Sequence, residues 1–333
     1  GCFVLTKPLD VIEVELALVA ILRQKNKDLK VSGVKNVETT QTNTNKMGYK
    51  PVIVVTGCSS GIGKALGKRL VANENYRVVL TAREKSLSRL RLEFRENDRV
   101  MILPLDLTNH LQIEQVTQNV VSQWGRIDVL VNNAGMSFRS VAEQMDASTE
   151  ELQMKTNYLG PMALIRAVIP MMRENGRGKI INVSSVSGYM GMPTMGSYSA
   201  SKHALEGATE SLWYELAPLG ISMSLIRPGF INSEGHEHVL VAPKAKIAEK
   251  LNGPYADFYQ FMRPFVARLM GLSAASSESI ADKIIKVIQT QNPALWNNVT
   301  FDAHGFSLLK KLLPANWFHQ IINFGFARPS SCG

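Results

Sequence analysis

A tyrosine and a lysine, Tyr198 and Lys202, are the residues of this chain whose types and spacing best suit proton transfer. They lie four positions apart, so on a helix the phenol and the ammonium would share one face. A free phenol titrates at about pH 10, and a nearby cation favours its phenolate. The pair therefore predicts a proton donor that works near neutral pH. By itself, the stretch YSASKHALEG also fits an ordinary helix start with scattered polar residues.

A glycine-rich turn lies upstream, between an apolar run and an amphipathic stretch. The run PVIVVT is followed by GCSSGIG, which has glycines at positions 57, 61 and 63, and then by KALGKRLVANE. Glycine is needed where backbone passes close to a pyrophosphate and where a helix packs tightly on a strand. The helix N-terminus adds free N–H groups that bind phosphate. In a first strand–turn–helix unit, this turn predicts a dinucleotide site.

The end of the second predicted strand favours one dinucleotide over another. An acidic residue there would bind the ribose 2′-OH of NAD, whereas an arginine accommodates the 2′-phosphate of NADP. Ala82 stands where the acidic residue would be expected, and Arg83 follows it. An arginine can pair with a phosphate through charge-assisted hydrogen bonds. We predict NADP(H) as the cofactor, with NAD(H) as the alternative. A solvated helix-start residue is the other interpretation of Arg83.

Apolar runs of strand length alternate with amphipathic stretches between residues 50 and 227. Alternation at this spacing indicates parallel βαβ units that are buried on both faces. The predicted fold is therefore α/β, a doubly wound, Rossmann-like parallel sheet of about seven strands. We expect strands at residues 51–56, 77–81, 100–105, 127–132, 179–183, 221–226 and 298–301, and helices after the glycine turn and at residues 84–97, 108–124 with Thr108 as its cap, 149–172, 198–219 and 277–289.

Further motifs complete the pattern. Ser185 lies thirteen residues before Tyr198, N-N-A-G follows the fourth strand at residues 132–135, and Asn157 lies in the long helix. With T-G-x-x-x-G-x-G and Y-x-x-x-K, these motifs identify residues 50 to about 302 as a member of the short-chain dehydrogenase/reductase family. The stretches TGCSSGIG, MGMP and SASKHALEG resemble its 17β-hydroxysteroid and retinol dehydrogenase branch.

The resemblance also implies which residues bind the cofactor. Asp106 matches a family residue near the adenine, and the P-G-x-I-x-T turn appears as PGFINS, in which Ser233 replaces threonine. Ser60 stands where many NADP-dependent relatives carry a base, which argues against NADP(H). The predicted cofactor residues are Thr56, Gly57, Ser59, Ser60, Gly61, Ile62, Gly63, Arg83, Asp106, Leu107, Asn133, Ala134, Gly135, Tyr198, Lys202, Pro228, Gly229, Ile231 and Ser233.

The resemblance implies reversible hydride transfer between nicotinamide and a carbonyl or alcohol carbon, with Tyr198 as the general acid or base. Lys202 would lower the pKa of Tyr198 and bind the nicotinamide ribose, and Ser185 would hydrogen-bond the substrate oxygen. Ser184 is the alternative to Ser185, although the thirteen-residue spacing favours Ser185. Asn157 would fix a water that links Lys202 to solvent. A buried amide bonded to backbone is the other interpretation of Asn157.

The predicted substrate side is apolar. Two segments would border the substrate beside Ser185: Met136, Ser137 and Phe138 after N-N-A-G, and the loop of residues 189–195. In that loop Met190, Met192 and Met195 give an adaptable apolar wall. Residues of about 230–276 form an irregular segment that is a substrate lid in this family, and its aromatic residues are Tyr255, Phe258, Tyr259, Phe261 and Phe265. Such residues are more often core than ligand contacts. Together they favour a lipophilic ketone, aldehyde or alcohol that is steroid-, retinoid- or lipid-like.

The remaining segments extend this domain at both ends. Residues 1–24 predict a strand, a turn and a helix that weakly resemble the end of a response-regulator receiver domain, with an ordinary amphipathic helix as the alternative. Residues 25–49 are polar and predict a linker. Residues 50–303 form the predicted catalytic domain. Residues 304–333 predict an amphipathic, basic tail that packs on protein or lies on a membrane surface.

The composition argues against several classes of protein. The net charge is +9, but Lys and Arg are dispersed, which argues against a nucleic-acid groove. Three distant cysteines argue against a disulfide framework, and no apolar run reaches the length of a spanning helix. His236 and His238 lack a third ligand, so no metal is assigned. We predict a cytoplasmic protein, peripherally membrane-associated if the tail binds lipid, and by family analogy a homodimer or homotetramer.

Two other functions fit parts of the sequence. A 3-oxoacyl thioester reductase would use the same residues, although the apolar lid and the long tail argue against it. A regulatory protein that senses NADP(H) without turnover is supported only by the receiver-like N-terminus. The intact set of Ser185, Tyr198, Lys202 and Asn157 favours catalysis.

Overall fold

The computed structural model describes residues 49–231, 239–251 and 253–325. Apart from Tyr49, they belong to one of the two units into which the chain divides, Lys50–Gly333. The predicted strand and helix at residues 1–24, the predicted linker up to residue 48, and Ser233 lie outside the described residues. The two histidines discussed for metal binding, His236 and His238, lie outside them as well.

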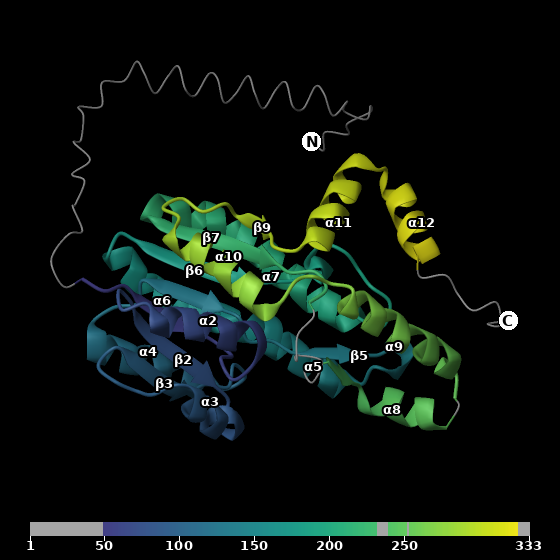
Figure 1. Ribbon diagram of the computed structural model, residues 1–333, viewed down its shortest axis with the longest axis horizontal. Helices are drawn as coiled ribbons and strands as arrows, with labels where there is room; N and C mark the ends of the chain where they lie inside the picture. Colours follow the sequence, from purple (N-terminus) through teal and green to yellow (C-terminus); the bar gives the residue numbers. More distant parts are fainter. Residues whose placement is uncertain (1–48, 232–238, 252, 326–333) are drawn as a thin grey trace, which may run out of the picture. The chain divides into compact units, whose positions relative to one another are not determined.

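A seven-stranded parallel sheet forms the centre of the described unit (Figure 1). Its order is β3-β2-β1-β4-β6-β7-β9, so the chain runs outward from β1 in one direction and then from β4 in the other. The strands are β1 Val52–Val55, β2 Arg77–Ala82, β3 Val100–Pro104, β4 Val129–Asn132, β6 Gly178–Val183, β7 Ile221–Arg227 and β9 Trp296–Asn298. This arrangement confirms the predicted doubly wound fold, and it places a topological switch point between β1 and β4, where such sheets bind ligands.

Helices cover both faces of the sheet. On one face α2 (Gly61–Ala72), α3 (Leu87–Glu93) and α10 (Ser277–Gln289) pack over Ile53 and Val55, and α2 and α10 lie side by side (Figure 1). On the other face α4 (His110–Trp124), α6 (Gly160–Glu174) and the end of α7 (Gly196–Leu216) pack over Val52 and Val54. Alternate residues of β1 thus enter opposite cores, which explains why the run VIVV is continuously apolar.

Three predicted boundaries are wrong for identifiable reasons. The cap of α4 is Asn109, whose side chain accepts from Gln112 N, because the Thr108 hydroxyl donates to Asp106 instead. The long helix predicted at residues 149–172 is three pieces: α5 (Ala147–Met154), a π-helical turn η3 (Lys155–Leu159) and α6. The last strand ends at Asn298, because the Thr300 side chain caps the next helix.

The substrate side contains a strand pair that we did not predict. β5 (Ser137–Arg139) pairs in parallel with β8 (Val239–Val241), which lies inside the predicted lid. The lid continues with α8 (Pro243–Lys250) and α9 (Ala256–Gly271), which Figure 1 shows beside β5. The short 3-10 helices are η1 Glu84–Ser86, η2 Ala142–Gln144, η4 Val186–Gly188 and η5 Ala217–Leu219.

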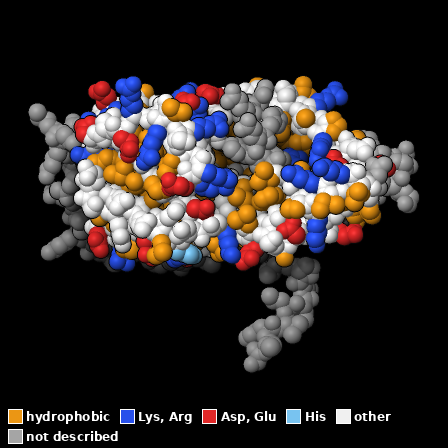
Figure 2. Space-filling model, turned by 90° about the horizontal axis from the view of Figure 1, so that it is seen from below, with side chains coloured by type: hydrophobic (Ala, Val, Ile, Leu, Met, Phe, Trp, Pro, Cys, Tyr) orange, Lys and Arg blue, Asp and Glu red, His pale blue; other side chains and the backbone are white. Residues whose placement is uncertain are grey.

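Two helices follow the sheet, α11 (Phe301–Leu312) and α12 (Ala315–Gly325). The boundary predicted between catalytic domain and tail, residue 303, therefore falls inside α11. Among the described residues, no helix is both long and apolar enough to cross a membrane. On the face seen in Figure 2, basic and acidic side chains are interspersed among apolar ones.

Candidate active site

The turn between β1 and α2 is closed against the turn after β4. Gly57 has a positive φ of 72°, and a Cβ atom on Gly63 would lie 2.1 Å from the carbonyl oxygen of Gly57, so neither position accepts a side chain. The Asn133 amide donates to the carbonyl oxygens of Thr56 (2.9 Å) and Gly57 (3.1 Å). In return, the Thr56 hydroxyl accepts from the backbone N–H groups of Asn133 and Ala134. The glycine motif and the N-N-A-G motif therefore form one rigid wall.

A cavity of about 600 Å³ runs along this wall at the carboxyl ends of the strands. Most of the predicted cofactor residues line it: Thr56, Gly57, Ser59, Ser60, Gly61, Ile62, Arg83, Asp106, Leu107, Asn133, Ala134, Gly135, Tyr198, Gly229 and Ile231. Lys202 and Pro228 instead line an adjoining space of about 220 Å³, and Gly63 packs behind Gly57. Sequence reasoning missed Ser86, Thr108 and Ser187, three hydroxyl residues that line the same cavity.

Ser185 and Tyr198 meet at the other end of this cavity. Ser185 follows β6 and caps η4, where its hydroxyl oxygen accepts from Ser187 N at 3.1 Å. Tyr198 lies in the first turn of α7 and lines the same cavity as Ser185. Burial raises the pKa of Tyr198, whereas the Ser185 hydroxyl and the positive charge of Arg139 lower it. The structure therefore places two hydroxyl groups together, with the phenol protonated at neutral pH.

Lys202 is buried one turn after Tyr198. Its ammonium lies 5.9 Å from the centroid of the Tyr198 ring and donates to the carbonyl oxygen of Val183 at 2.8 Å. Burial lowers the pKa of Lys202 to about 8, against the opposing effect of the Glu206 carboxylate. Its predicted effects on the tyrosine and on the nicotinamide ribose stay predictions.

Asn157 lies in the π-helical turn η3 and is bonded to backbone, as its second interpretation predicts. Its Oδ1 accepts from Met136 N (2.8 Å), and its Nδ2 donates to Met136 O (2.8 Å) and to the Ser201 hydroxyl (3.0 Å). π-Helical turns are frequent at functional sites. This turn orients the amide toward the backbone of Met136, the residue that precedes β5. The predicted water between Asn157 and Lys202 stays a prediction.

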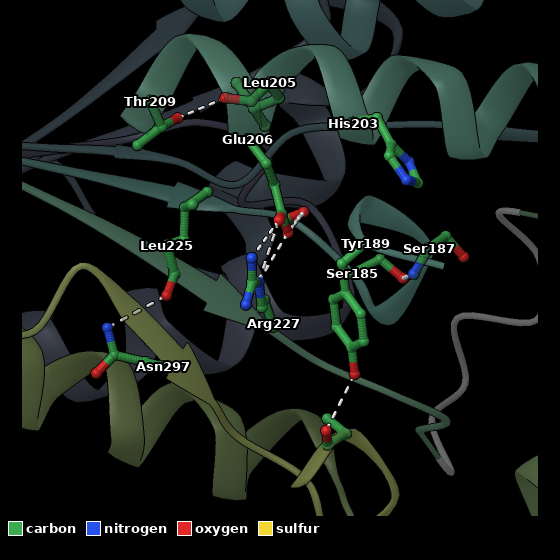
Figure 3. Close-up of polar contacts among 12 residues, drawn as sticks. Ser185, Ser187, Tyr189, His203, Leu205, Glu206, Thr209, Leu225, Arg227 and Asn297 are labelled. Atoms are coloured by element: carbon green, nitrogen blue, oxygen red, sulfur yellow. Dashed lines mark hydrogen bonds and ion pairs between the residues drawn. The ribbon is translucent and has the colours of Figure 1, made fainter. Parts of the chain in front are cut away.

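A buried ion pair that the sequence did not predict joins Glu206 and Arg227 close to Ser185 (Figure 3). The Arg227 guanidinium donates to both carboxylate oxygens of Glu206, at 2.5 to 3.1 Å, and Ser184 donates to the same carboxylate at 2.7 Å. Ser184 is thus committed to Glu206, which leaves Ser185 to face the cavity. Glu206 lies four residues after Lys202, on the same helix face, and that spacing was the available signal.

Arg227 also supports the loop between the serine and the tyrosine. Its guanidinium lies 4.9 Å from the centroid of the Tyr189 ring. The Tyr189 hydroxyl donates to the carbonyl oxygen of Ala303 at 3.0 Å, and Lys310 donates to the carbonyl oxygen of Tyr189 (Figure 3 shows the first bond). The loop of residues 186–195, the catalytic loop between the predicted catalytic residues Ser185 and Tyr198, is therefore joined to α11.

A second cavity of about 680 Å³ adjoins the first and shares Met192 and Phe230 with it. Its lining is mainly apolar and comes from the catalytic loop, α9, α11 and α12. The predicted substrate methionines divide between the cavities: Met136, Met192 and Met195 line the first, and Met190 and Met192 the second.

Of the five lid aromatics, Phe265 lines the second cavity. Tyr259 is instead a core residue whose hydroxyl accepts from Val141 N and donates to Gln144.

A family match assigns this chain to a class of proteins. Residues 51–241 match the family model described as short chain dehydrogenase. The chain therefore belongs to the short-chain dehydrogenase family, as the motifs predicted. Residues 1–24 lie outside the matched range, so their receiver-like resemblance stays a prediction.

Individual relatives agree with this assignment. A stretch of 183 residues is 39% identical to the 3-ketodihydrosphingosine reductase of Bacteroides thetaiotaomicron, and covers 55% of this chain and 64% of that protein. The chain therefore spans less than two thirds of the length of this curated relative. A stretch of 247 residues is 32% identical to the oxidoreductase YusZ of Bacillus subtilis, covering 73% of this chain and 86% of that protein. Among solved structures, a metagenomic short-chain oxidoreductase in complex with NADP is 28% identical with a TM-score of 0.57, covering 75% of this chain and 96% of that one.

Proposed function

We propose that this chain is an oxidoreductase that uses NADP(H) to interconvert a lipophilic ketone or aldehyde and its alcohol. One observation carries the proposal. Ser185 and Tyr198 border the same cavity of about 600 Å³ as the glycine turn and Arg83. A nucleotide on the turn and a carbonyl on the two hydroxyl groups would therefore share one enclosed space.

The residues at the glycine-turn end of the cavity fit a dinucleotide. Gly57 and Gly63 leave no room for a Cβ atom, so backbone lies where a pyrophosphate must approach, at the N-terminus of α2. The exposed guanidinium of Arg83 lines the cavity and suits a 2′-phosphate, which favours NADP(H) over NAD(H). The NADP complex of the metagenomic relative supports the same choice. When bound, a nicotinamide dinucleotide supplies or accepts the hydride.

The residues at the other end of the cavity, Ser185 and Tyr198, fit proton transfer to a carbonyl oxygen. Because burial keeps Tyr198 protonated at neutral pH, its hydroxyl can donate to the substrate oxygen during reduction. The Ser185 oxygen accepts from Ser187 N, so its own hydrogen is available to the same substrate oxygen. Lys202, with a pKa of about 8, can exchange a proton near neutral pH. In the reverse direction Tyr198 would accept the proton from the alcohol.

The second cavity supports a lipophilic substrate. It adjoins the first cavity and shares Met192 and Phe230 with it, so an apolar chain attached to the reacting carbon would extend past these residues into it. The printed name of the Bacteroides relative, a 3-ketodihydrosphingosine reductase, describes a reductase of a lipid ketone and is compatible with this site.

We also propose that α11 and α12 touch a membrane surface as a peripheral contact. Phe301 and Ile321 line the second cavity yet are 94% and 50% exposed, and Trp317 is 62% exposed. Lys310 and Lys311 lie near the end of α11, which suits anionic headgroups. A lipid substrate could then enter from the bilayer. Sedimentation with anionic liposomes tests this contact, and equal sedimentation of a form truncated after Thr300, which keeps β9, would contradict it. A cytoplasmic location and homo-oligomerisation remain expectations from the family.

A substrate panel tests the main proposal. NADPH and NADH oxidation would be measured with long-chain ketones, aldehydes, steroid ketones and 3-oxoacyl thioesters. We expect turnover of the long-chain carbonyl compounds with a preference for NADPH. Preferred turnover of the thioesters would favour the thioester reductase. Tight NADPH binding without turnover of any compound would favour the sensor.

A further inference from the structure

Two polar side chains of β5 face the catalytic cavity. Ser137 and Arg139 lie two positions apart on the strand, so their side chains leave the same face. Both line the cavity of about 600 Å³, and Phe138, which lies between them, does not. Ser185 and Tyr198 line the same cavity, so the guanidinium and the predicted catalytic pair border one space.

Both side chains carry a buried atom whose hydrogen-bonding capacity is unused. In the described part of the chain, the Ser137 Oγ and the Arg139 Nε have no hydrogen-bond partner. No carboxylate of the described residues forms an ion pair with Arg139 either. Because an arginine stays charged and burying an unpaired charge is costly, such a side chain is expected to meet an anion. Burial accordingly lowers the pKa of Arg139.

The strand that carries these residues is held on both sides. Asn157 binds both backbone polar groups of Met136, and the Gln153 side chain accepts from Phe138 N at 2.5 Å. On the opposite side β5 pairs with β8, and Ala242 N donates to Arg139 O at 3.1 Å. The two side chains therefore project from a fixed backbone, which lowers the entropic cost of binding a ligand.

We propose that Arg139 and Ser137 form a subsite for an anionic oxygen group of the substrate, a carboxylate or a phosphate, beside the carbonyl group that Ser185 and Tyr198 hold. This inference rests on the proposed function and narrows its substrate class. The substrate is an amphiphile: its anionic group lies at β5, its reacting carbon lies at Tyr198, and its apolar part extends past Met192 into the second cavity.

The cofactor does not account for this subsite. The dinucleotide phosphates are expected at the glycine turn and at Arg83, at the end of the cavity away from the catalytic pair. The guanidinium of Arg139, which lines the cavity that Tyr198 lines, is therefore left for the substrate. Arginine suits the task because its planar fork binds carboxylate and phosphate oxygens through two parallel hydrogen bonds.

Matched substrates test the subsite on the full chain with NADPH. The probes are keto fatty acids of one chain length with the ketone at different positions, their uncharged methyl esters, and keto-alkyl phosphates. For the anionic probe that the parent prefers, we expect Arg139→Met to lower kcat/KM by about 10–100-fold. The corresponding ester should change by less than about 3-fold. Arg139→Lys should keep part of the preference, and Ser137→Ala should lose less than Arg139→Met. The parent's preference between acid and phosphate identifies the anion.

Arg89→Met, on the exposed surface of α3, is the control variant. It should leave the ratio of kcat/KM for each anionic probe to that for its ester unchanged. Equal losses for acids and esters with a shifted pH profile would overturn the subsite and make Arg139 a positioning residue for Tyr198. A raised KM for NADPH alone would assign Arg139 to the cofactor, and unchanged ratios would remove it from recognition. If the parent reduced no probe, the proposed function would fail, and calorimetric binding of the same acids and esters to the NADPH-loaded parent and Arg139→Met would still decide the subsite.

Discussion

The two ends of the catalytic cavity are built from different kinds of contact. At the cofactor end, Thr56 and Asn133 bond to backbone across two turns, and Gly57 and Gly63 remove side chains altogether. At the substrate end, Ser137 and Arg139 keep buried polar atoms that no described residue satisfies. The first end presents backbone to one constant ligand. The second presents side chains whose remaining hydrogen-bonding capacity a particular substrate must complete.

The largest expected effect separates chemistry from cofactor binding. Tyr198→Phe removes the hydroxyl at the substrate end and should lower kcat by about 10²–10⁴-fold. The dissociation constant of NADPH, measured by fluorescence titration, should stay within about 3-fold of the parent's, because the glycine turn is untouched. Tyr214→Phe, at an exposed position of the same helix, serves as the control. Similar turnover by parent and Tyr198→Phe would take the phenol out of the mechanism.

Lys202 lines the small space that adjoins the catalytic cavity, and its burial predicts a pH-dependent stability difference. Its pKa is about 8 in the folded protein and 10.5 ordinarily, so the buried charge disfavours the folded state below pH 8. That penalty is relieved as the pH rises from about 8 to 10.5, since only the unfolded chain then keeps the proton. Lys202→Met lacks the penalty. We therefore expect its free energy of unfolding, relative to the parent's, to fall by up to about 3 kcal/mol across this interval.

Urea denaturation at several pH values measures this difference for Lys202→Met. Lys85→Met, at an exposed position with no such burial, should show a difference from the parent that is constant with pH. A constant difference for Lys202→Met would mean that the folded protein does not perturb this lysine.

The third prediction concerns the rigid wall at the cofactor end. Gly63→Ala places a Cβ atom 2.1 Å from the Gly57 carbonyl oxygen, so the backbone must move at a cost of about 1–3 kcal/mol. We expect a lower melting temperature and a higher KM for NADPH. Gly207→Ala, in α7 with open space around its Cβ, should instead be neutral or stabilise slightly. Equal behaviour of the two variants would contradict the close packing of this turn.

The last prediction concerns the choice between cofactors. Arg83→Ala should reduce the preference for NADPH over NADH by about 10–100-fold, since a charge-assisted contact to the 2′-phosphate is lost. The ratio of kcat/KM for the two cofactors measures it, and kcat at saturating NADPH should change little. An unchanged ratio would move 2′-phosphate recognition away from Arg83.

The cofactor end of the cavity could be predicted from the sequence more fully than the substrate end. The glycine turn, N-N-A-G and the Tyr198–Lys202 pair are short motifs, so their positions in the cavity followed once the alternating strands and helices were recognised. Ser137 lies two residues after N-N-A-G, and the sequence likewise predicts it at the border of the substrate site. The position of Arg139 depends instead on the pairing of β5 with β8, about 100 residues later in the chain. No local pattern indicates that pairing. The Glu206–Arg227 ion pair likewise joins a helix and a strand through tertiary contact.

Two smaller errors, the cap of α4 and the continuous helix predicted at residues 149–172, have local causes. Thr108 is a plausible helix cap, but Asp106 takes its hydroxyl and Asn109 is the better cap. The π-helical turn at residues 155–159 leaves no visible mark in an amphipathic pattern, although it orients Asn157 toward Met136.

The contacts of Tyr189 have a consequence for protein engineering. This residue of the catalytic loop donates to Ala303 O and accepts from Lys310 through its carbonyl oxygen, both in α11. Loop and tail helix therefore form one exchangeable module. A chimera that takes the last two helices from a relative should take residues 186–195 from the same source. Grafting the helices alone would leave the new tail without the partner with which it evolved.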